Sequence, residues 1–353
     1  MIKVINAPKS FELKKLGKQI PYVFLAGPAA KETLWRNEAI EMIRETLPNQ
    51  DIVLLNPQRF DWPEDDQEEA WNEQVNWETI GLRFCDIVFF YIPKPPSVFI
   101  EKDFGKTTRS ELTECLARGK KVVVGIDDLF AGSKYLKKKC KDYGFEPASS
   151  LRSAVNKLAY ELSKFDITDE EDRPKFFVSD THFGAERTLQ LSRRPFLSVE
   201  DMDWRMVELW NSVVSPNGIV YHLGDIGEWY DPKKMRDEMN PLHYLNGEII
   251  LISGNYERKD GISDLPMSKV VQIKDSHKVV LAHEPCLAKE ILEKKPDCKY
   301  ALFGHIHGRQ KIKPFGVDVG VDSWNYKPHT EEDVKFFLNA LDKGYYDKEV
   351  WIQ

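Results

Sequence analysis

The stretch Lys175-Phe-Phe-Val-Ser-Asp-Thr-His182 decides the fold of the second half of the chain. It is an apolar run of strand length that ends at a polar Asp-x-His cluster. The arrangement recurs, because the apolar runs at 218–221, 248–252, 278–282 and 300–303 are each followed by Asp, Asn or His. We expect five β-strands that deliver five sets of polar side chains to one edge of a sheet.

The five clusters contain side chains of the kinds that bind divalent metal ions. Their candidate ligands are Asp180, His182, Asp225, Asn255, His283, His305 and His307. Two divalent ions need several imidazole and carboxylate ligands and one bridging carboxylate, and this set supplies them. A single Asp-x-His is more often structural. Five such clusters in order, each after an apolar run, predict a two-metal site.

The series resembles the calcineurin-like metallophosphoesterase family, whose motifs run D-x-H, G-D, G-N-H-[DE], H and G-H-x-H. The resemblance covers about residues 175 to 328 and implies an α/β fold with a β-sandwich and flanking helices. It implies that Asp180, His182, Asp225 and His307 hold one ion, and that Asp225, Asn255, His283 and His305 hold the second. Asp225 would bridge ions such as Mn²⁺, Ni²⁺, Fe²⁺ or Zn²⁺, which activate water for attack on a phosphate ester.

The sequence departs from that family at Gly254-Asn255-Tyr256-Glu257, where tyrosine replaces the usual histidine. In the family this histidine stabilises or protonates the leaving group. A phenol is a weaker acid than an imidazolium but still donates a hydrogen bond. We expect Tyr256 to take that catalytic part with slow turnover or an easy leaving group; the alternative is that Tyr256 only packs over the site.

A basic pair, Arg193-Arg194, follows the first cluster. Arginine binds phosphate in a bidentate manner, so Arg194 is a candidate substrate-binding residue. The alternative is a solvated basic pair with no ligand.

The first half alternates apolar runs with helical segments. Strands are expected at 22–26, 51–55, 87–92 and 121–125, and helices at 33–46, 72–84 and 109–118. This alternation is typical of a doubly wound parallel sheet. We therefore expect domains at 1–149 and 175–353, with residues 150–174 forming a helix and a linker.

No histidine occurs in the first half, so carboxylates must carry any chemistry there. Leu25-Ala-Gly-Pro28 closes the first expected strand, and Glu111 stands eight residues before Gly119-Lys120. These features resemble the nucleoside 2-deoxyribosyltransferase family over residues 22 to 127.

That resemblance implies that Glu111 attacks the anomeric carbon of a nucleoside and forms a glycosyl-enzyme ester. It also implies that Asp86 lines the site as a proton donor or sugar ligand, with Asp103 and Asn56 assisting substrate binding. Phe24 stands where the family often has tyrosine, which leaves open whether water or another base is the acceptor. The alternative is that Glu111 is an ordinary carboxylate near a helix N-terminus.

Composition narrows the choice of partners. The 353 residues carry 57 Asp+Glu against 50 Lys+Arg, a net charge of -7, which makes polymeric nucleic acid and anionic membranes poor partners. Five scattered cysteines and the lack of an apolar leader or spanning segment predict a reduced, cytoplasmic protein. The second resemblance also implies a homo-oligomer.

The sequence therefore predicts a bifunctional enzyme acting on small nucleosides or nucleotides. One half would hydrolyse a phosphate ester, and the other would cleave or transfer an N-glycosidic bond. The alternative is a metal-dependent phosphodiesterase or nuclease whose first half only binds nucleotides or mediates oligomerisation.

Overall fold

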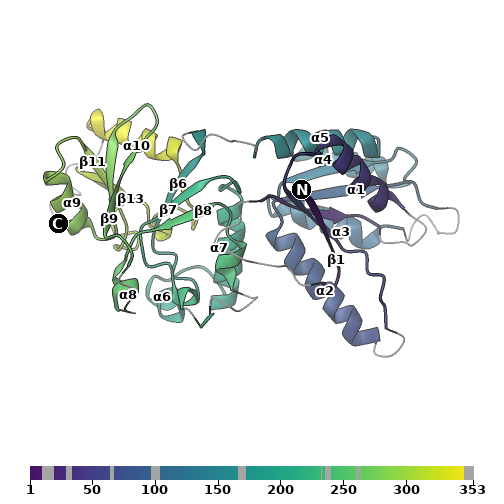
Figure 1. Cartoon of the computed structure of the whole chain (residues 1–353), viewed down its shortest axis with the longest axis horizontal. Coiled ribbons are helices and arrows are strands. Elements are labelled where there is room, and N and C mark those ends of the chain that lie inside the picture. The colour runs from purple at the N-terminus through teal and green to yellow at the C-terminus, as the bar shows by residue number, and fades with distance from the viewer. Residues whose placement is uncertain are drawn as a thin grey trace. The chain divides into compact units, whose positions relative to one another are not determined.

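The computed structural model describes residues 1–9, 20–28, 34–63, 67–96, 104–165, 172–231, 233–234, 240–259, 261 and 264–345. The described residues form two compact units (Figure 1). The first unit takes those up to Phe165 and the second unit those from Asp172 onward.

The first unit is built on a five-stranded parallel sheet with the order β1-β3-β2-β4-β5. Its strands are β1 (Ile2–Asn6), β2 (Tyr22–Ala26), β3 (Ile52–Asn56), β4 (Ile87–Ile92) and β5 (Val122–Ile126). Its helices are α1 (Trp35–Thr46), α2 (Gln67–Phe84), α3 (Lys106–Ala117), α4 (Ser133–Asp142) and α5 (Leu151–Ser163). The strand order reverses beside β2, and doubly wound sheets bind ligands outside the carboxyl ends of strands at such a point.

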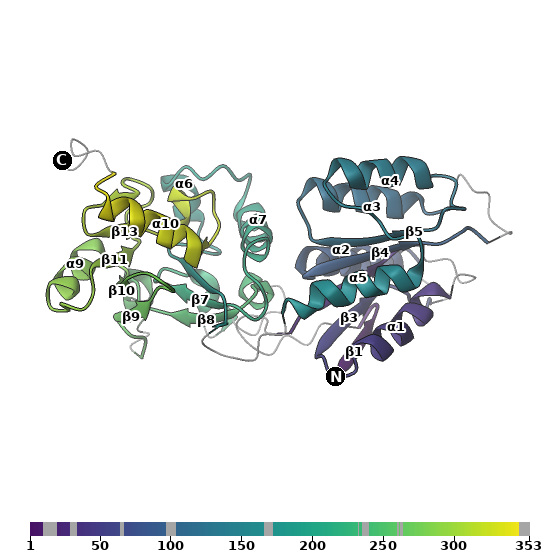
Figure 2. The ribbon, with the colours of Figure 1, turned by 90° about the horizontal axis from the view of Figure 1, so that it is seen from above.

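Helices cover both faces of this sheet. Helices α1 and α5 lie on one face, and α2 and α3 lie on the other (Figure 2). Val23 and Phe89 of the sheet share one buried apolar cluster with Ile43 of α1 and with Val155 and Leu158 of α5. Helix α5 corresponds to the helix predicted within residues 150–174, and its buried side chains belong to the core of the first unit. Residues 166–171 of the predicted linker lie outside the described residues.

The second unit contains two sheets, with the orders β14-β6-β7-β8 and β12-β13-β11-β10-β9. The strands of the first sheet are β6 (Lys175–Val178), β7 (Ile219–His222), β8 (Glu248–Leu251) and β14 (His329–Thr330). Those of the second are β9 (Ser268–Gln272), β10 (Lys278–Ala282), β11 (Tyr300–Phe303), β12 (Ile312–Lys313) and β13 (Gly316–Asp318). The helices are α6 (Glu186–Leu191), α7 (Val199–Asn211), α8 (Asn255–Lys259), α9 (Pro285–Glu293) and α10 (Glu331–Asp342), and short 3-10 turns are η2 (Glu228–Tyr230), η4 (Pro241–Tyr244) and η5 (Val321–Ser323).

Side chains of both sheets meet in one core. Phe177 of β6 and Tyr221 of β7 belong to the same buried cluster as Val279 of β10, Leu302 of β11 and Val334 of α10. The strands that precede the five polar clusters thus belong to two sheets that share one core. The apolar runs alone did not show which strand belongs to which sheet, because such a run shows that a strand is buried but not which strand it pairs with.

No helix among the described residues is both long and apolar enough to cross a membrane.

Candidate functional sites

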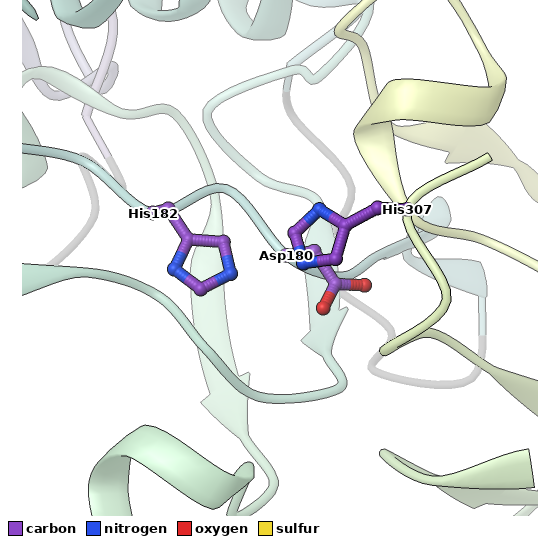
Figure 3. Close-up of side chains that lie close together, drawn as sticks. All are labelled: Asp180, His182 and His307. Carbon is purple, nitrogen blue, oxygen red and sulfur yellow. The ribbon is translucent and has the colours of Figure 1, made fainter. Parts of the chain in front are cut away.

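The polar clusters of the second unit converge in two groups. Asp180, His182 and His307 form one group, and Asp225, His283 and His305 form the other, with one ligand atom from each residue lying within 4.8 Å of the others in its group. Figure 3 shows the first group, in which His307, from the loop after β11, lies beside Asp180. Each group therefore combines residues that are far apart in the sequence.

Asp225 belongs to the second group, but one of its oxygens also lies near His182 of the first group. Its Oδ2 atom is 3.6 Å from Nε2 of His182 and 3.4 Å from Nε2 of His283. A carboxylate that reaches both groups occupies the place of a bridging ligand.

Asn255 completes the second group. Its Oδ1 atom lies 2.9 Å from Nε2 of His283 and 3.0 Å from Nδ1 of His305. Nδ1 of His283 lies 2.9 Å from the carbonyl oxygen of Leu223, so the N–H sits on Nδ1 and Nε2 is directed at the other donors. Several lone-pair atoms thus face one point, which is favourable only if a cation or a proton lies among them.

The charges around His283 favour a cation. Burial opposes a positive charge there, but the hydrogen bond to Asp225 and the charges of Asp180 and Asp225 outweigh it and raise the pKa of His283 to about 9. Burial raises the pKa of Asp225, but the hydrogen bond and charge of His283 and the backbone N–H of Tyr256 outweigh burial and lower this pKa to about 2. The surroundings that hold a proton here would also hold a metal ion.

Three buried atoms of the first group have no hydrogen-bond partner among the described residues. They are Oδ1 of Asp180 and both ring nitrogens of His182. Leaving a buried polar group unsatisfied costs about 1–3 kcal/mol, so such groups are usually ligands or are otherwise engaged. Burial also lowers the pKa of His182 to about 3, which keeps its imidazole neutral and able to bind a metal. The donor set fits two divalent ions.

The backbone of the donor residues is unusual. Asp180, His182, Asp225, His305 and His307 have φ angles of 58°, 51°, 55°, 72° and 45°. Residues other than glycine rarely adopt positive φ, and such strain clusters at functional sites. Five of the nine described non-glycine residues with this conformation belong to the donor set.

Two glycines make room for the carboxylates. A Cβ atom at Gly304 would lie 2.3 Å from Oδ2 of Asp180, and one at Gly254 would lie 2.2 Å from Oδ1 of Asp225. Any larger residue would displace a predicted ligand.

Glu257 supports the loops that carry Asp225 and Asn255. Its buried carboxylate accepts hydrogen bonds from the backbone N–H groups of Gly254, Asp225 and Ile226, at 2.8, 2.9 and 2.8 Å. No role for Glu257 was predicted from the sequence, although the residue belongs to the motif Gly254-Asn255-Tyr256-Glu257.

The contact of Asp322 with His307 was not predicted from the sequence. The Oδ2 atom of Asp322 lies 2.8 Å from Nδ1 of His307, which leaves Nε2 of that ring for a metal ion. The available signal was the position of Asp322 between the last cluster and the C-terminal helix.

Arg194 was predicted to bind substrate, but it does not line the pocket that lies beside the predicted metal ligands. Its guanidinium is buried, forms a bidentate pair with Asp322 at 2.9 Å, and donates to the carbonyl oxygens of Asp180 and Thr181 at 2.6 and 2.7 Å. Through these contacts the Arg194 side chain stabilises the loop that carries Asp180. The exposed residue of the pair is Arg193.

Tyr256 lies beside the donor set. Its ring meets that of His182 edge-on, with centroids 4.9 Å apart. It is half-buried and lines a pocket of about 470 Å³ together with His305 and His307. A substrate in this pocket would have both the predicted metal ligands and the Tyr256 side chain beside it.

The first unit places Glu111 in a small charged cluster. Burial and the charge of Glu78 on α2 raise the pKa of Glu111 to about 7, although Arg36 acts against them. Arg36 is buried and donates to the carbonyl oxygens of Leu25 and Pro28, at 3.1 and 2.9 Å, at the carboxyl end of β2. Burial likewise raises the pKa of Glu78. Sequence reasoning missed Glu78, because a single carboxylate on a polar helix carries no signal.

Asp86 does not join this cluster. It precedes β4 and accepts a hydrogen bond at 2.7 Å from the backbone N–H of Tyr22, the first residue of β2. This is the amino end of the sheet, and a six-residue strand places it about 20 Å from the carboxyl end. Its predicted catalytic part is not supported by this position.

Asn56 lies at the carboxyl end of β3, but its amide is occupied. It is buried, donates to Oδ1 of Asn6 at 2.9 Å and accepts from the backbone N–H of Gln58 at 3.2 Å. It therefore ties β3 to β1. Asp103 lies outside the described residues.

Residues 20–129 match the family model described as nucleoside 2-deoxyribosyltransferase like. The uncharacterized protein MJ1445 of Methanocaldococcus jannaschii is 31% identical over 186 residues, which cover 49% of this chain and 93% of that protein. The chain belongs to the family of MJ1445.

Membership of the MJ1445 family brings no known activity, because that relative is itself uncharacterized. A protein of unknown function from Aquifex aeolicus, AQ665, is similar in structure with a TM-score of 0.38 and 22% identity, covering 47% of this chain and all of its own. The family model that matches residues 20–129 does suggest a chemistry for that domain, namely glycosyl transfer on a small substrate.

Proposed function

We propose that the second unit hydrolyses a phosphate ester with two divalent metal ions, and that the first unit cleaves or transfers the N-glycosidic bond of a nucleoside or nucleotide. The position of Asp225 Oδ2 between two groups of metal-binding side chains carries the first proposal. The resemblance of the motifs to calcineurin-like metallophosphoesterases supports it.

The chain's own residues prepare the phosphoesterase site. The two ions would supply an activated water and neutralise charge on the phosphoryl oxygens. Leu223 and Asp322 fix the tautomers of His283 and His307, so their other ring nitrogens remain free to bind a metal. Tyr256 borders the pocket and would donate its phenolic hydrogen bond to the leaving oxygen.

Two neighbouring carboxylates define the chemistry of the first unit. Glu78 and Glu111 interact electrostatically, and burial raises the pKa of both, so each carboxyl group keeps a proton more readily than it would in water. The ionised Glu111 would attack the anomeric carbon while the bond to the base breaks, and the protonated Glu78 would give its proton to the departing base. Water or a second base would then release the sugar from Glu111.

The test incubates the metal-loaded protein with nucleoside 5′-monophosphates and separates free base, nucleoside and phosphate by chromatography. We expect Asp225→Asn to lower phosphate release by more than about 100-fold, because the bridging charge is lost. We expect Glu111→Ala to abolish base release and to leave phosphate release intact.

A different result would refute the activity proposed for each unit. Monophosphates left uncleaved with every metal would refute the phosphomonoesterase reading, and cleavage of a diester alone would identify a phosphodiesterase. Absence of base release from the unmodified protein would reduce the first unit to a binding module. The expected homo-oligomer is checked by sedimentation.

A further inference from the structure

The pocket beside the metal-binding groups is large enough for more than a phosphate. Its volume is about 470 Å³, within the range of about 300–1,000 Å³ that is typical of small-molecule sites. On one side it is lined by Tyr256, His305 and His307, so it opens directly onto the predicted ligands.

Three arginines line the same pocket. Arg187 lies on α6, Arg193 follows that helix, and Arg309 follows the loop of His307. All three are exposed, and their side chains form no ion pair or hydrogen bond with any residue that the structure describes. The remaining lining residues are Thr188, Leu191, Ser192 and Ile306 besides the three named above, so no carboxylate balances the arginines within the pocket.

This arrangement is unusual for the chain as a whole. Acidic residues outnumber basic ones, 57 to 50, and the neighbouring Arg194 is fully paired with Asp322 and two carbonyl oxygens. Arg193 also has a left-handed backbone, with φ of 50°, as the metal-binding residues do.

A single phosphate does not account for this charge. Two divalent ions with the carboxylates of Asp180 and Asp225 would leave about two positive charges, which one phosphate dianion balances. Three guanidinium groups then remain, and guanidinium binds phosphate oxygens in a bidentate manner.

We propose that the substrate of the metal site carries a second phosphate group, which Arg187, Arg193 and Arg309 bind while the first is hydrolysed. This inference rests on the proposed phosphoesterase function. The pocket volume and the net charge of -7 favour a small bisphosphorylated molecule over a nucleic acid strand.

The test compares adenosine 3′,5′-bisphosphate with adenosine 5′-monophosphate as substrates of the metal-loaded protein. We expect kcat/KM for the bisphosphate to be higher by at least about 10-fold, since bidentate guanidinium–phosphate contacts are strong charge-assisted hydrogen bonds. The variants Arg187→Gln, Arg193→Gln and Arg309→Gln should each reduce this preference, mainly through KM. The matched control is Lys289→Gln, which removes an exposed positive charge from α9 and should retain the preference.

Equal kcat/KM for the two nucleotides, or a preference that survives all three substitutions, would overturn the inference. If neither nucleotide is hydrolysed, the phosphoesterase proposal fails. Calorimetric titration with both nucleotides then tests separately whether the three arginines bind a second phosphate group. A binding preference for the bisphosphate that the arginine variants lose would support it, and equal binding would refute it. Tighter binding of a 20-nucleotide single strand would assign the pocket to nucleic acid instead.

Discussion

Glu111 shows how its surroundings set the chemistry of one residue. Burial and the charge of Glu78 raise its pKa from 4.5 to about 7. A carboxyl group with such a pKa exists in both protonation states near neutral pH, which suits a group that alternates between nucleophile and leaving group.

The raised pKa of Glu111 has a cost for stability with a defined sign. Between pH 4.5 and 7 the folded chain keeps a proton on Glu111 that the unfolded chain releases, so the free energy of unfolding falls as pH rises through this window. We expect Glu111→Gln, which cannot ionise, to stabilise the protein by up to about 3 kcal/mol more at pH 8 than at pH 4.5.

Urea unfolding at the two pH values measures this difference. Glu114→Gln is the matched control, because Glu114 is an exposed residue of the same helix that pairs with Arg118. A gain at pH 8 no larger than that of the control would contradict the assignment of a raised pKa to Glu111.

The sequence identified the side chains that converge but not the ones that are buried for structural reasons. Asp180 and His307 were recognised because clusters of metal-binding residue types follow apolar runs. Arg194 was chosen because arginine binds phosphate, and Asn56 and Asp86 were chosen through the second family resemblance, yet their side chains contact backbone or structural partners. Whether a polar group faces a ligand or a carbonyl oxygen depends on tertiary contacts, which spacing along the chain does not encode.

At the scale of elements, the loops after β7 and β8 are joined through one carboxylate. Glu257, on the short helix α8, accepts backbone hydrogen bonds from both loops. This couples the position of Asp225 to that of Asn255.

We expect Glu257→Gln to weaken metal binding by about 10–100-fold, as other losses of supporting contacts behind metal ligands do. The amide keeps one acceptor oxygen, but its NH₂ group faces a backbone donor. Calorimetric titration with Mn²⁺ measures the effect, with Glu293→Gln at the exposed end of α9 as the control. Unchanged affinity would show that the loops hold their positions without Glu257.

Strands were predicted best where apolar residues run without interruption. The bounds of β2, β4, β6, β10 and β11 match the predicted segments, because each run is buried and bounded by polar or turn residues. Strand β1 was missed, since its five residues become a strand through pairing with β3. Strand β9 is largely exposed and contains two central valines, too few for a recognisable pattern.

At the scale of the whole molecule, each unit has its own apolar core. The predicted metal ligands belong to the second unit alone. Removing the metals should therefore act on one core and leave the other unaffected.

We expect a chelator to lower the unfolding temperature of the second unit by several degrees, and that of the first unit to stay constant, because a ligand stabilises only the structure that binds it. Differential scanning calorimetry of the metal-loaded protein measures both transitions. Asp225→Asn identifies the metal-dependent one, which should already be lowered and should not respond to chelator. Equal displacement of both transitions would show that the units unfold together.

The wide separation of the predicted ligands in the sequence also limits when a metal ion could be bound during synthesis. Asp180 follows the first strand of the second unit, and His307, which shares its group, follows β11. During synthesis the early loops emerge well before their partners, so a nascent chain that ends before His305 holds only part of either group. Long-range contacts of this kind form late in folding. A metal ion bound as we propose would therefore meet the full donor set only after His307 has been synthesised, while β12, β13 and β14 of the two sheets still follow in the sequence.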